Sequence, residues 1–533
     1  MKKHLALAAC LLPALGGLVS CSPVRHEVAA PAAPFDQRFW VEDYVTGLTF
    51  PWEMTWLPNG DLLLTQRKGK LTLIRDGKVI GDIAGVPEVM SASPYDGLLD
   101  VKLDPDFATN HNVFLTYTVG DMTARVGVVY RARLDGTRLV EGRELFRTSP
   151  PAPTGGPNIM RMLFLPDKSL LVAVGCSGQP GSGMVQSLAS DLGKIIRINR
   201  DGSMPADNAL AATAPGARPE FFAGGFRSPS GLALDDQNRL WGIDIGPWGG
   251  DELNLVEPGK NYGWPLATWG FDYSGRAMSD RQGGAGFEDP VLVWSPSIAP
   301  SGLVVYRGNA FPAWNGDLFL GSLSGMSVWR VRVSNGKVVQ QERLLADLHE
   351  RIRSVASGPD GYLYAITDAA NGKLLRLRPG KPAPAELARV AKPFAMPDKL
   401  SIIEQLKLHG VMQQDATVAD EQVPYDPVRA AELVTERCGA CHSYRDIAHG
   451  EIGPRLDGLH GRRSGTLPGY AYSAALSNET TRVTWDHFTL VAFITNPQAY
   501  YPGTKMTAPP VPYEEAIQIS KLLNDAKIGV DQL

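Results

Sequence analysis

A short unit in which a tight turn leads into an apolar strand recurs six times between residues 57 and 364. The units begin at Leu57, Leu103, Leu165, Leu234, Trp314 and Gly358. Asn, Asp, Pro and Gly supply the turns, as they do in hairpins between antiparallel strands. Repeats several tens of residues apart are typical of β-propellers, in which each repeat forms one blade. A β-sandwich is the alternative, but so regular a repeat favours a six-bladed β-propeller.

The chain divides into domains by its length and its periodicity. A chain of 533 residues is too long for one ordinary hydrophobic core. Short apolar runs between turn signals extend over residues 35–380, and residues 381–426 open on a Pro/Ala-rich stretch that predicts a linker. Helical periodicity marks residues 427–527, with a terminal amphipathic helix over 513–523. The expected fold class is mainly β, with a six-bladed β-propeller followed by a small all-α domain.

A second motif, Cys438–His442, contains two cysteines three residues apart and a histidine directly after them. This spacing is the attachment signature of c-type haem, because two thiols add to the two vinyl groups of one porphyrin and the histidine can ligate iron. Met506 offers a second axial ligand, and a Met/His pair raises the haem potential into the electron-transfer range. We therefore expect Cys438 and Cys441 to hold haem c covalently, with His442 and Met506 on its iron.

The N-terminal segment has the pattern of a targeting signal. Two lysines precede an apolar stretch over residues 5–18, which is too short to span a membrane. Small residues then lead into Cys21, which resembles a bacterial lipobox. We expect a signal peptide over residues 1–20, lipidation of Cys21, and a Pro/Ala-rich tether over 21–34. A plain secretory signal cleaved near Ser20 is the alternative. Both predict export, and the first places the protein on a membrane in the bacterial periplasm or at the outer surface.

Charge and motifs narrow the classes of function. The net charge is −4 and no long basic run occurs, so nothing indicates nucleic-acid binding. No GxGxxG motif opens a βαβ unit, so a nicotinamide or flavin site of that kind is not indicated. A haem accepts one electron and cannot oxidise an organic substrate alone. The propeller is therefore expected to carry a second redox cofactor or to receive one.

Residues 427–527 resemble class I cytochrome c. The resemblance rests on the haem motif and on residues 453–454, 458–462, 469–473, 485 and 496–506. It implies that the carbonyl of Pro454 accepts a hydrogen bond from the second ring nitrogen of His442, which fixes the tautomer of the imidazole. It also implies that the haem propionates are bound by Arg462, Tyr470, Tyr472 and Trp485. Core packing is the alternative role for Trp485.

The propeller residues resemble the soluble aldose sugar dehydrogenases, also called glucose/sorbosone dehydrogenases. The resemblance rests on residues 97–101, 192–199, 246–254, 259–265, 300–303 and 351–353. It implies a six-bladed propeller that oxidises a sugar or alcohol with pyrroloquinoline quinone (PQQ) and calcium. Electrons would then pass to haem c and on to a downstream redox protein or respiratory chain.

The resemblance assigns roles to individual residues. Arg227 matches a quinone-site arginine, and Arg351 and Arg353 match a pair that binds the PQQ carboxylates, for which bidentate guanidinium contacts are suited. The carbonyls of Gly246 and Pro247 match the ligands of the cofactor's calcium, a hard ion that prefers oxygen. A second, structural calcium matches more weakly to Glu252, Tyr262 and Asp272.

The chain also departs from the family pattern. The catalytic histidine of the family is missing from residues 156–160, and other expected polar residues are replaced by Tyr95, Cys176, Ser228 and Ser324. In an extended segment, His349 would share a face with Arg351 and Arg353. We hypothesise that His349 is a relocated general base; a polar residue at a strand entrance is the alternative. Two rival functions remain: a catalytically degenerate binding propeller that carries an electron-transfer cytochrome c domain, and an oxidoreductase with another substrate and base.

Overall fold

The structure is a computed structural model that describes two stretches of the chain. The first is residues 38–393, apart from 93–94, 122–123, 153–157, 177–182, 209–215, 271–277, 280–282 and 285. The second is residues 425–477, with 485, 490–491, 493–494, 497, 504–506, 511 and 513–524. The predicted signal peptide, Cys21 and the tether lie outside the described residues.

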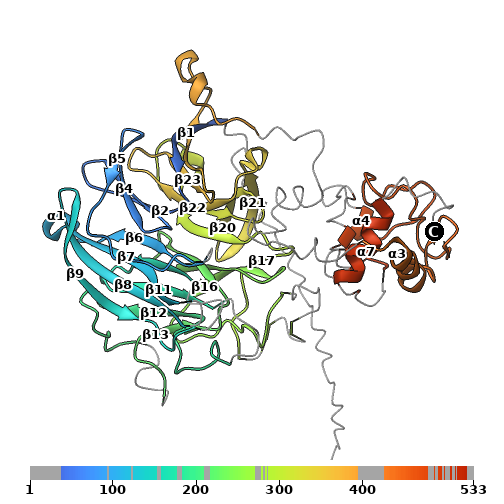
Figure 1. Cartoon of the computed structure of the whole chain (residues 1–533), viewed down its shortest axis with the longest axis horizontal. Helices are drawn as coiled ribbons and strands as arrows, with labels where there is room; N and C mark the ends of the chain where they lie inside the picture. Colours follow the sequence, from blue (N-terminus) through green and yellow to red (C-terminus); the bar gives the residue numbers. More distant parts are fainter. Residues whose placement is uncertain are drawn as a thin grey trace, which may run out of the picture. The chain divides into compact units, whose positions relative to one another are not determined.

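Six four-stranded antiparallel sheets form among the described residues, one for each blade (Figure 1). The first blade has β2 (Pro51–Trp56), β3 (Leu62–Gln66), β4 (Lys70–Arg75) and β5 (Lys78–Asp82). The second has β6 (Leu98–Leu103), β7 (Asn112–Asp121), β8 (Ala124–Asp135) and β9 (Arg138–Arg147). The third has β10 (Asn158–Phe164), β11 (Leu170–Gly175), β12 (Lys194–Ile198) and β13 (Phe221–Gly224).

The other three blades follow the same order. The fourth has β14 (Pro229–Leu234), β15 (Leu240–Asp244), β16 (Asp251–Val256) and β17 (Leu292–Trp294). The fifth has β18 (Pro300–Val305), β19 (Leu318–Ser322), β20 (Ser327–Ser334) and β21 (Lys337–Leu344). The sixth has β22 (Ile352–Ser357), β23 (Leu363–Thr367), β24 (Gly372–Pro379) and β1 (Phe39–Leu48). Short helices are α1 (Phe107–Asn110), η1 (Pro312–Trp314), η2 (Ala346–Leu348) and η3 (Pro384–Arg389).

The two ends of the propeller chain meet in the sixth blade. β1 is its outermost strand and pairs with β24, with Phe39 opposite Pro379. The fully buried carboxylate of Glu42 on β1 forms ion pairs with Arg376 at 2.8 Å and with Arg389 at 2.5 Å. The closure therefore rests on both strand pairing and buried charge.

The six repeated turns join the first and second strands of the six blades, as the repeat predicts. Six hydrophobic clusters lie between neighbouring blades. For example, Leu63 packs in one cluster with Val113, and Phe114 packs in the next with Val172. The core is therefore divided into layers between the sheets. The predicted six-bladed propeller is confirmed.

Each blade's first strand carries one extra residue near its start. The register of β2, β6, β10, β14, β18 and β22 with the second strand shifts there. These first strands contact one another around the central axis. A β-bulge re-aims the side chain of the extra residue. Glu53, Asp100, Ser230 and Arg353 lie at such shifts.

The C-terminal domain is mainly helical where it is described. Its elements are α3 (Pro427–Leu433), η4, a π-helix (Val434–Cys438), α4 (Ala474–Ser477) and α7 (Tyr513–Asn524), with the short strands β25 (Ser443–Tyr444) and β26 (Ala448–His449). Asp426 caps α3 by accepting from the backbone N–H groups of Val428 and Arg429. α7 confirms the predicted terminal helix. No helix in the described part of the chain is long and apolar enough to span a bilayer.

Candidate functional site

One face of the propeller collects the residues with predicted cofactor roles. Arg227 lies two residues before the first strand β14, and Arg351 directly precedes the first strand β22. Gly246 and Pro247 follow the second strand β15. In an antiparallel blade, the start of the first strand and the end of the second lie at the same face. The fold therefore places these four residues at one face.

Arg351 and Arg353 share a partner that the sequence did not identify. Nη2 of Arg353 donates to Oδ2 of Asp368 at 2.7 Å, and Nη2 of Arg351 lies 3.3 Å from the same oxygen. Burial alone would raise the pKa of Asp368, but the two guanidinium groups outweigh it and hold the pKa below its usual range. Burial lowers the pKa of Arg353 to about 10. Asp368 and Arg353 are therefore both charged at neutral pH.

Arg353 also stacks on an aromatic side chain. Its guanidinium carbon lies 4.1 Å from the ring centroid of Trp52, which is 1% exposed. Nε of Arg353 and Nε1 of Trp52 are buried and have no hydrogen-bond partner among the described residues. Two unpaired buried donors beside an arginine pair fit an anionic ligand with several oxygen acceptors. These residues therefore fit the carboxylates of PQQ.

Buried carboxylates hold the loop with the predicted calcium carbonyls. Oδ1 of Asp251 accepts from the backbone N–H of Gly246 at 2.8 Å, and Asp244 accepts from the backbone N–H of Arg227 at 2.8 Å. Nη1 of Arg227 donates to the Gly246 carbonyl at 3.0 Å. Residue 246 must be glycine, because a Cβ there would lie 2.2 Å from the carbonyl oxygen of Gly249.

The pKa values of these acids reflect their burial. Burial raises the pKa of Asp244 to about 6, although backbone donors oppose it. Burial raises the pKa of Asp251 to about 7 against four hydrogen-bond donors, and that of Glu252 to about 8, with further repulsion from Asp244. The carbonyl oxygens of Gly246 and Pro247 lie in the loop that Asp251 holds, and calcium prefers oxygen ligands of this kind, so the loop fits the ion.

The proposed second calcium ligands are only partly described. Glu252 is buried and lies opposite Asp244 in the β15–β16 pair. The hydroxyl of Tyr262 donates to the Leu255 carbonyl and accepts from the backbone N–H of Glu257, so this hydroxyl is already engaged within the protein. Asp272 lies outside the described residues. Their joint role stays a prediction.

The geometric basis for His349 as the base is wrong. His349 follows η2 and adopts a left-handed backbone, with φ of 50° and ψ of 37°. β22 begins only at Ile352. The alternation of side chains along an extended strand therefore does not apply between His349 and Arg351. A left-handed turn cannot be read from this sequence, because histidine is not a residue that requires one.

Two of the other positions that depart from the family pattern, Cys176 and Ser324, form internal hydrogen bonds. The backbone N–H of Cys176 donates to the Arg227 carbonyl at 2.7 Å. The hydroxyl of Ser324 donates to the Ser297 carbonyl at 3.0 Å. The hydroxyl of Ser228 is buried and has no partner in the described part of the chain. Residues 153–157, which include part of the stretch where the histidine was expected, lie outside the described residues.

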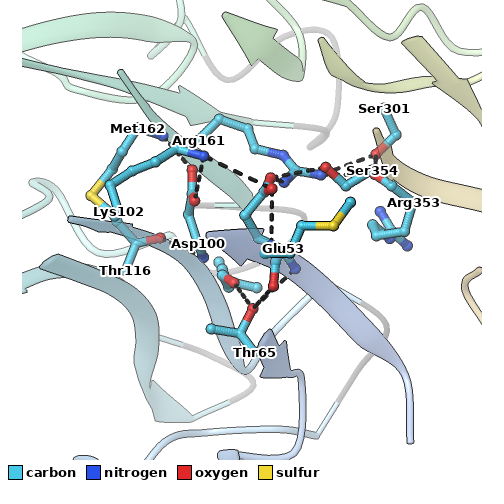
Figure 2. Close-up of polar contacts among 12 residues, drawn as sticks. Glu53, Thr65, Asp100, Lys102, Thr116, Arg161, Met162, Ser301, Arg353 and Ser354 are labelled. Atoms are coloured by element: carbon cyan, nitrogen blue, oxygen red, sulfur yellow. Dashed lines mark hydrogen bonds and ion pairs between the residues drawn. The ribbon is translucent and has the colours of Figure 1, made fainter. Parts of the chain in front are cut away.

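A charged network at the propeller axis was also missed by the sequence analysis (Figure 2). Arg161 on β10 forms an ion pair with Glu53 on β2, and Lys102 on β6 lies 3.2 Å from Asp100. Arg161, Glu53 and Asp100 are almost fully buried. The available signal was the charged residues inside three apolar runs, one in β2, two in β6 and one in β10, because such residues are seldom buried unless paired.

The haem motif has the geometry expected for an attachment site. Cys438 is buried at the end of η4 and Cys441 is exposed, and neither forms a disulfide among the described residues. Burial raises the pKa of Cys438 to about 11, with a smaller effect of Cys441. Nδ1 of His442 lies 2.7 Å from the Pro454 carbonyl, which is the predicted contact. It leaves Nε2 for a metal.

A glycine makes room beside this histidine. A Cβ on Gly453 would lie 2.3 Å from Cε1 of His442 and 2.5 Å from Nδ1. Burial lowers the pKa of His442, and the hydrogen bond to Pro454 opposes this. A partly buried imidazole whose Nδ1 contacts the Pro454 carbonyl can offer Nε2 to haem iron, so this site fits haem. Met506 is half-buried, and its backbone N–H donates to the hydroxyl of Thr504.

The four residues predicted at the propionates are brought together. The backbone N–H of Trp485 donates to the Arg462 carbonyl at 2.9 Å. The rings of Tyr470 and Tyr472 meet edge to face at 4.7 Å. Burial raises the pKa of Tyr472, and the charge of Arg462 opposes this. Trp485 also packs in the core of the domain, so its predicted packing role is confirmed.

Comparisons with known proteins agree with this division. Residues 48–376 match the family model "Glucose / Sorbosone dehydrogenase". The aldose sugar dehydrogenase YliI of Escherichia coli is 40% identical over 340 residues, which cover 62% of this chain and 91% of that protein. The PQQ-bound aldose sugar dehydrogenase structure from Streptomyces coelicolor is 28% identical with a TM-score of 0.54, and the match covers 65% of this chain and all of the other.

A second relative matches a smaller segment. Cytochrome c of Sesamum indicum is 39% identical over 105 residues, which cover 19% of this chain and 93% of that protein. The propeller and the haem motif therefore come from two known families. The chain belongs to the glucose/sorbosone dehydrogenase family and carries a segment that belongs to the cytochrome c family.

Proposed function

We propose that this protein is a quinohaemoprotein dehydrogenase that oxidises a sugar or alcohol and delivers the electrons to its own haem c. PQQ, when bound, supplies two-electron oxidation of a hydroxyl or aldehyde-level carbon, and haem c relays single electrons. A sugar oxidoreductase with a haem relay is what the two family memberships support in general terms. PQQ, calcium and the membrane anchor are the finer parts of the proposal.

The Arg351–Arg353 pair carries the cofactor part of the proposal. Both guanidinium groups are held by Asp368, and Arg353 leaves a buried Nε donor unpaired within the described residues. These two arginines would bind the cofactor's carboxylates, and the unpaired N–H of Trp52 would face the same ligand. The net charge of the two arginines and Asp368 is positive, which favours a polyanion.

The calcium part rests on the loop after β15. The carbonyls of Gly246 and Pro247 would provide oxygen ligands, and Asp251 fixes the loop through the N–H of Gly246. The catalytic base is not assigned, since the geometric premise for His349 failed. A substrate and base different from those of the aldose-oxidising relatives are therefore part of what must be tested.

Reconstitution tests the proposal. The full-length, haem-loaded chain is titrated with PQQ in the presence of calcium by isothermal titration calorimetry, and then with aldoses and simple alcohols while the haem absorbance is followed. We expect tight, calcium-dependent PQQ binding and substrate-dependent haem reduction. Absence of PQQ binding would refute the proposal and favour the alternative of a catalytically degenerate binding propeller. The missing histidine and the serines at positions 228 and 324 support that alternative.

We further propose export and lipid anchoring at Cys21, on the basis of the targeting pattern alone. The wild-type chain should partition with membranes and incorporate labelled fatty acid in a bacterial host. Cys21→Ala should remove the label. Incorporation that persists in Cys21→Ala would contradict the assignment, and export without label in the wild type would favour the plain secretory signal.

A further inference from the structure

An ion pair at the centre of the propeller joins two blades that are not neighbours. Arg161 lies on β10 and Glu53 on β2, with β6 between their strands in the ring of first strands. The side chains are 3% and 6% exposed. Water screens such a pair little, so it links the first and third blades firmly.

The same pair holds the entrance of β22 in the sixth blade (Figure 2). Nη2 of Arg161 donates to the carbonyl oxygen of Arg353 at 2.8 Å, and the hydroxyl of Ser301 donates to that oxygen at 2.7 Å. The hydroxyl of Ser354 donates to Oε2 of Glu53 at 2.9 Å. Two consecutive residues of β22 are thus tied to one ion pair.

Arg353 needs such contacts because it lies at a β-bulge. The register between β22 and β23 shifts between Ile352 and Ser354, so Arg353 has no opposite residue in the ladder. At a bulge, contacts outside the ladder decide where the side chain points. The carbonyl of Arg353 is held at the axis, while its guanidinium reaches Asp368 and the ring of Trp52.

The charges of the axial network balance one another. Glu53 and Asp100 contribute two negative charges, and Arg161 and Lys102 contribute two positive charges. Nζ of Lys102 lies 3.2 Å from Asp100 and 3.9 Å from Glu53. The network therefore does not need an ion or ligand for neutrality. What the network does is fix the position of the bulge at Arg353 on β22.

We propose that Glu53 is a positioning residue that holds the β22 bulge through Arg161 and Ser354 and thereby aims the Arg353 guanidinium at an anionic cofactor. The inference deepens the proposed function, on which the identity of the cofactor rests. Glu53 itself touches neither the cofactor nor the substrate in this account. Loss of its charge should therefore weaken cofactor binding without removing a cofactor contact.

The test compares Glu53→Gln with a matched control in the full-length, haem-loaded chain. Glu53→Gln keeps the size of the side chain and removes its charge. Asp317→Asn is the control, because Asp317 forms an equally buried ion pair with Arg330 at 2.7 Å, with exposures of 5% and 4%, within the fifth blade. Both variants should lower the thermal stability of the propeller, so stability alone does not separate them.

PQQ affinity and backbone exchange separate them. In Glu53→Gln, the dissociation constant for PQQ with calcium present should rise about tenfold or more, as when one charge-assisted hydrogen bond is misplaced. Amide hydrogen exchange of the apo chain should accelerate at residues 352–354. Asp317→Asn should change the dissociation constant by less than about twofold and leave that exchange unchanged.

Ser354→Ala removes a single hydrogen bond and serves if Glu53→Gln does not fold; it should raise the dissociation constant about threefold. The inference is overturned if the folded variants bind PQQ within about twofold of the wild type, the scatter expected between independent sites. A wild type that binds no PQQ overturns the proposed function instead. In that case amide hydrogen exchange alone tests the role of Glu53. Unchanged exchange at residues 352–354 in Glu53→Gln would show that Glu53 does not hold the bulge.

Discussion

Replacing Arg161 by methionine should destabilise the propeller strongly, because it leaves the carboxylate of Glu53 buried without its main partner. Both side chains are almost fully buried, so no discount for solvent screening applies. Breaking one side of a buried pair costs about 3–5 kcal/mol. Lys102 lies 3.9 Å from Glu53 and offsets part of this loss, which favours the lower end, about 3 kcal/mol.

The double variant Arg161→Met with Glu53→Met is the control. It removes one charge of each sign and leaves Asp100 paired with Lys102. Apolar side chains of similar volume often replace a buried pair at little cost, so we expect a loss of about 1 kcal/mol or less. The double variant should be stable, but it should bind PQQ more weakly than the wild type, because Arg353 is no longer held.

Calorimetric unfolding of the full-length chain measures both effects. At about 2 °C per kcal/mol for a domain of this size, the single variant should lower the propeller transition by about 6 °C. The cytochrome transition should stay where it is. A single variant within about 1 kcal/mol of the wild type would refute the reasoning, and so would a double variant that loses as much as the single one.

Three further predictions concern other sites. Cys441→Ala should leave the haem attached through a single thioether, to Cys438, or should let it dissociate when the protein is denatured. A haem stain of a denaturing gel and the haemochrome spectrum check this, and a variant in which both are unchanged would contradict the attachment at Cys441. Gly453→Ala should displace the imidazole of His442, since its Cβ would lie 2.3 Å from the ring, and a changed haem absorbance spectrum reports it, whereas an unaltered spectrum would contradict the close approach. Burial lowers the pKa of Lys194 from 10.5 to about 8. Between these pH values the unfolded chain binds more protons than the folded chain, so the propeller should become more stable as pH rises, by up to about 3 kcal/mol. Lys194→Met should remove this gain in stability, and a variant with the same pH profile as the wild type would contradict the prediction.

The parts of this protein that could be read from its sequence are those set by local chemistry. The turn residues at the six hairpins predicted the six blades, since the conformations that Asn, Asp and Gly adopt do not depend on distant contacts. The CxxCH motif was recognised because its three chemical groups lie within five residues. The contact between His442 and Pro454 was implied by the resemblance to class I cytochrome c, and the structure contains it.

What escaped prediction depends on the closure of the propeller. Glu53 and Arg161 are 108 residues apart and meet only because the blades form a ring. Asp368 directly follows β23 and becomes a partner of Arg353 through the pairing of β22 with β23, which the sequence analysis did not use. His349 was misplaced for a local reason, since its left-handed backbone has no signature in this sequence.

The most direct test of the account is haem reduction by substrate in a single chain. Full-length protein loaded with haem c, PQQ and calcium is mixed with an aldose without an external acceptor, and the absorbance of the reduced haem is followed. The account predicts reduction that requires PQQ and that is lost in a variant with Arg351→Ala and Arg353→Ala. A chain that binds PQQ and oxidises the sugar while its haem stays oxidised would contradict the central claim, as would a chain that binds no PQQ.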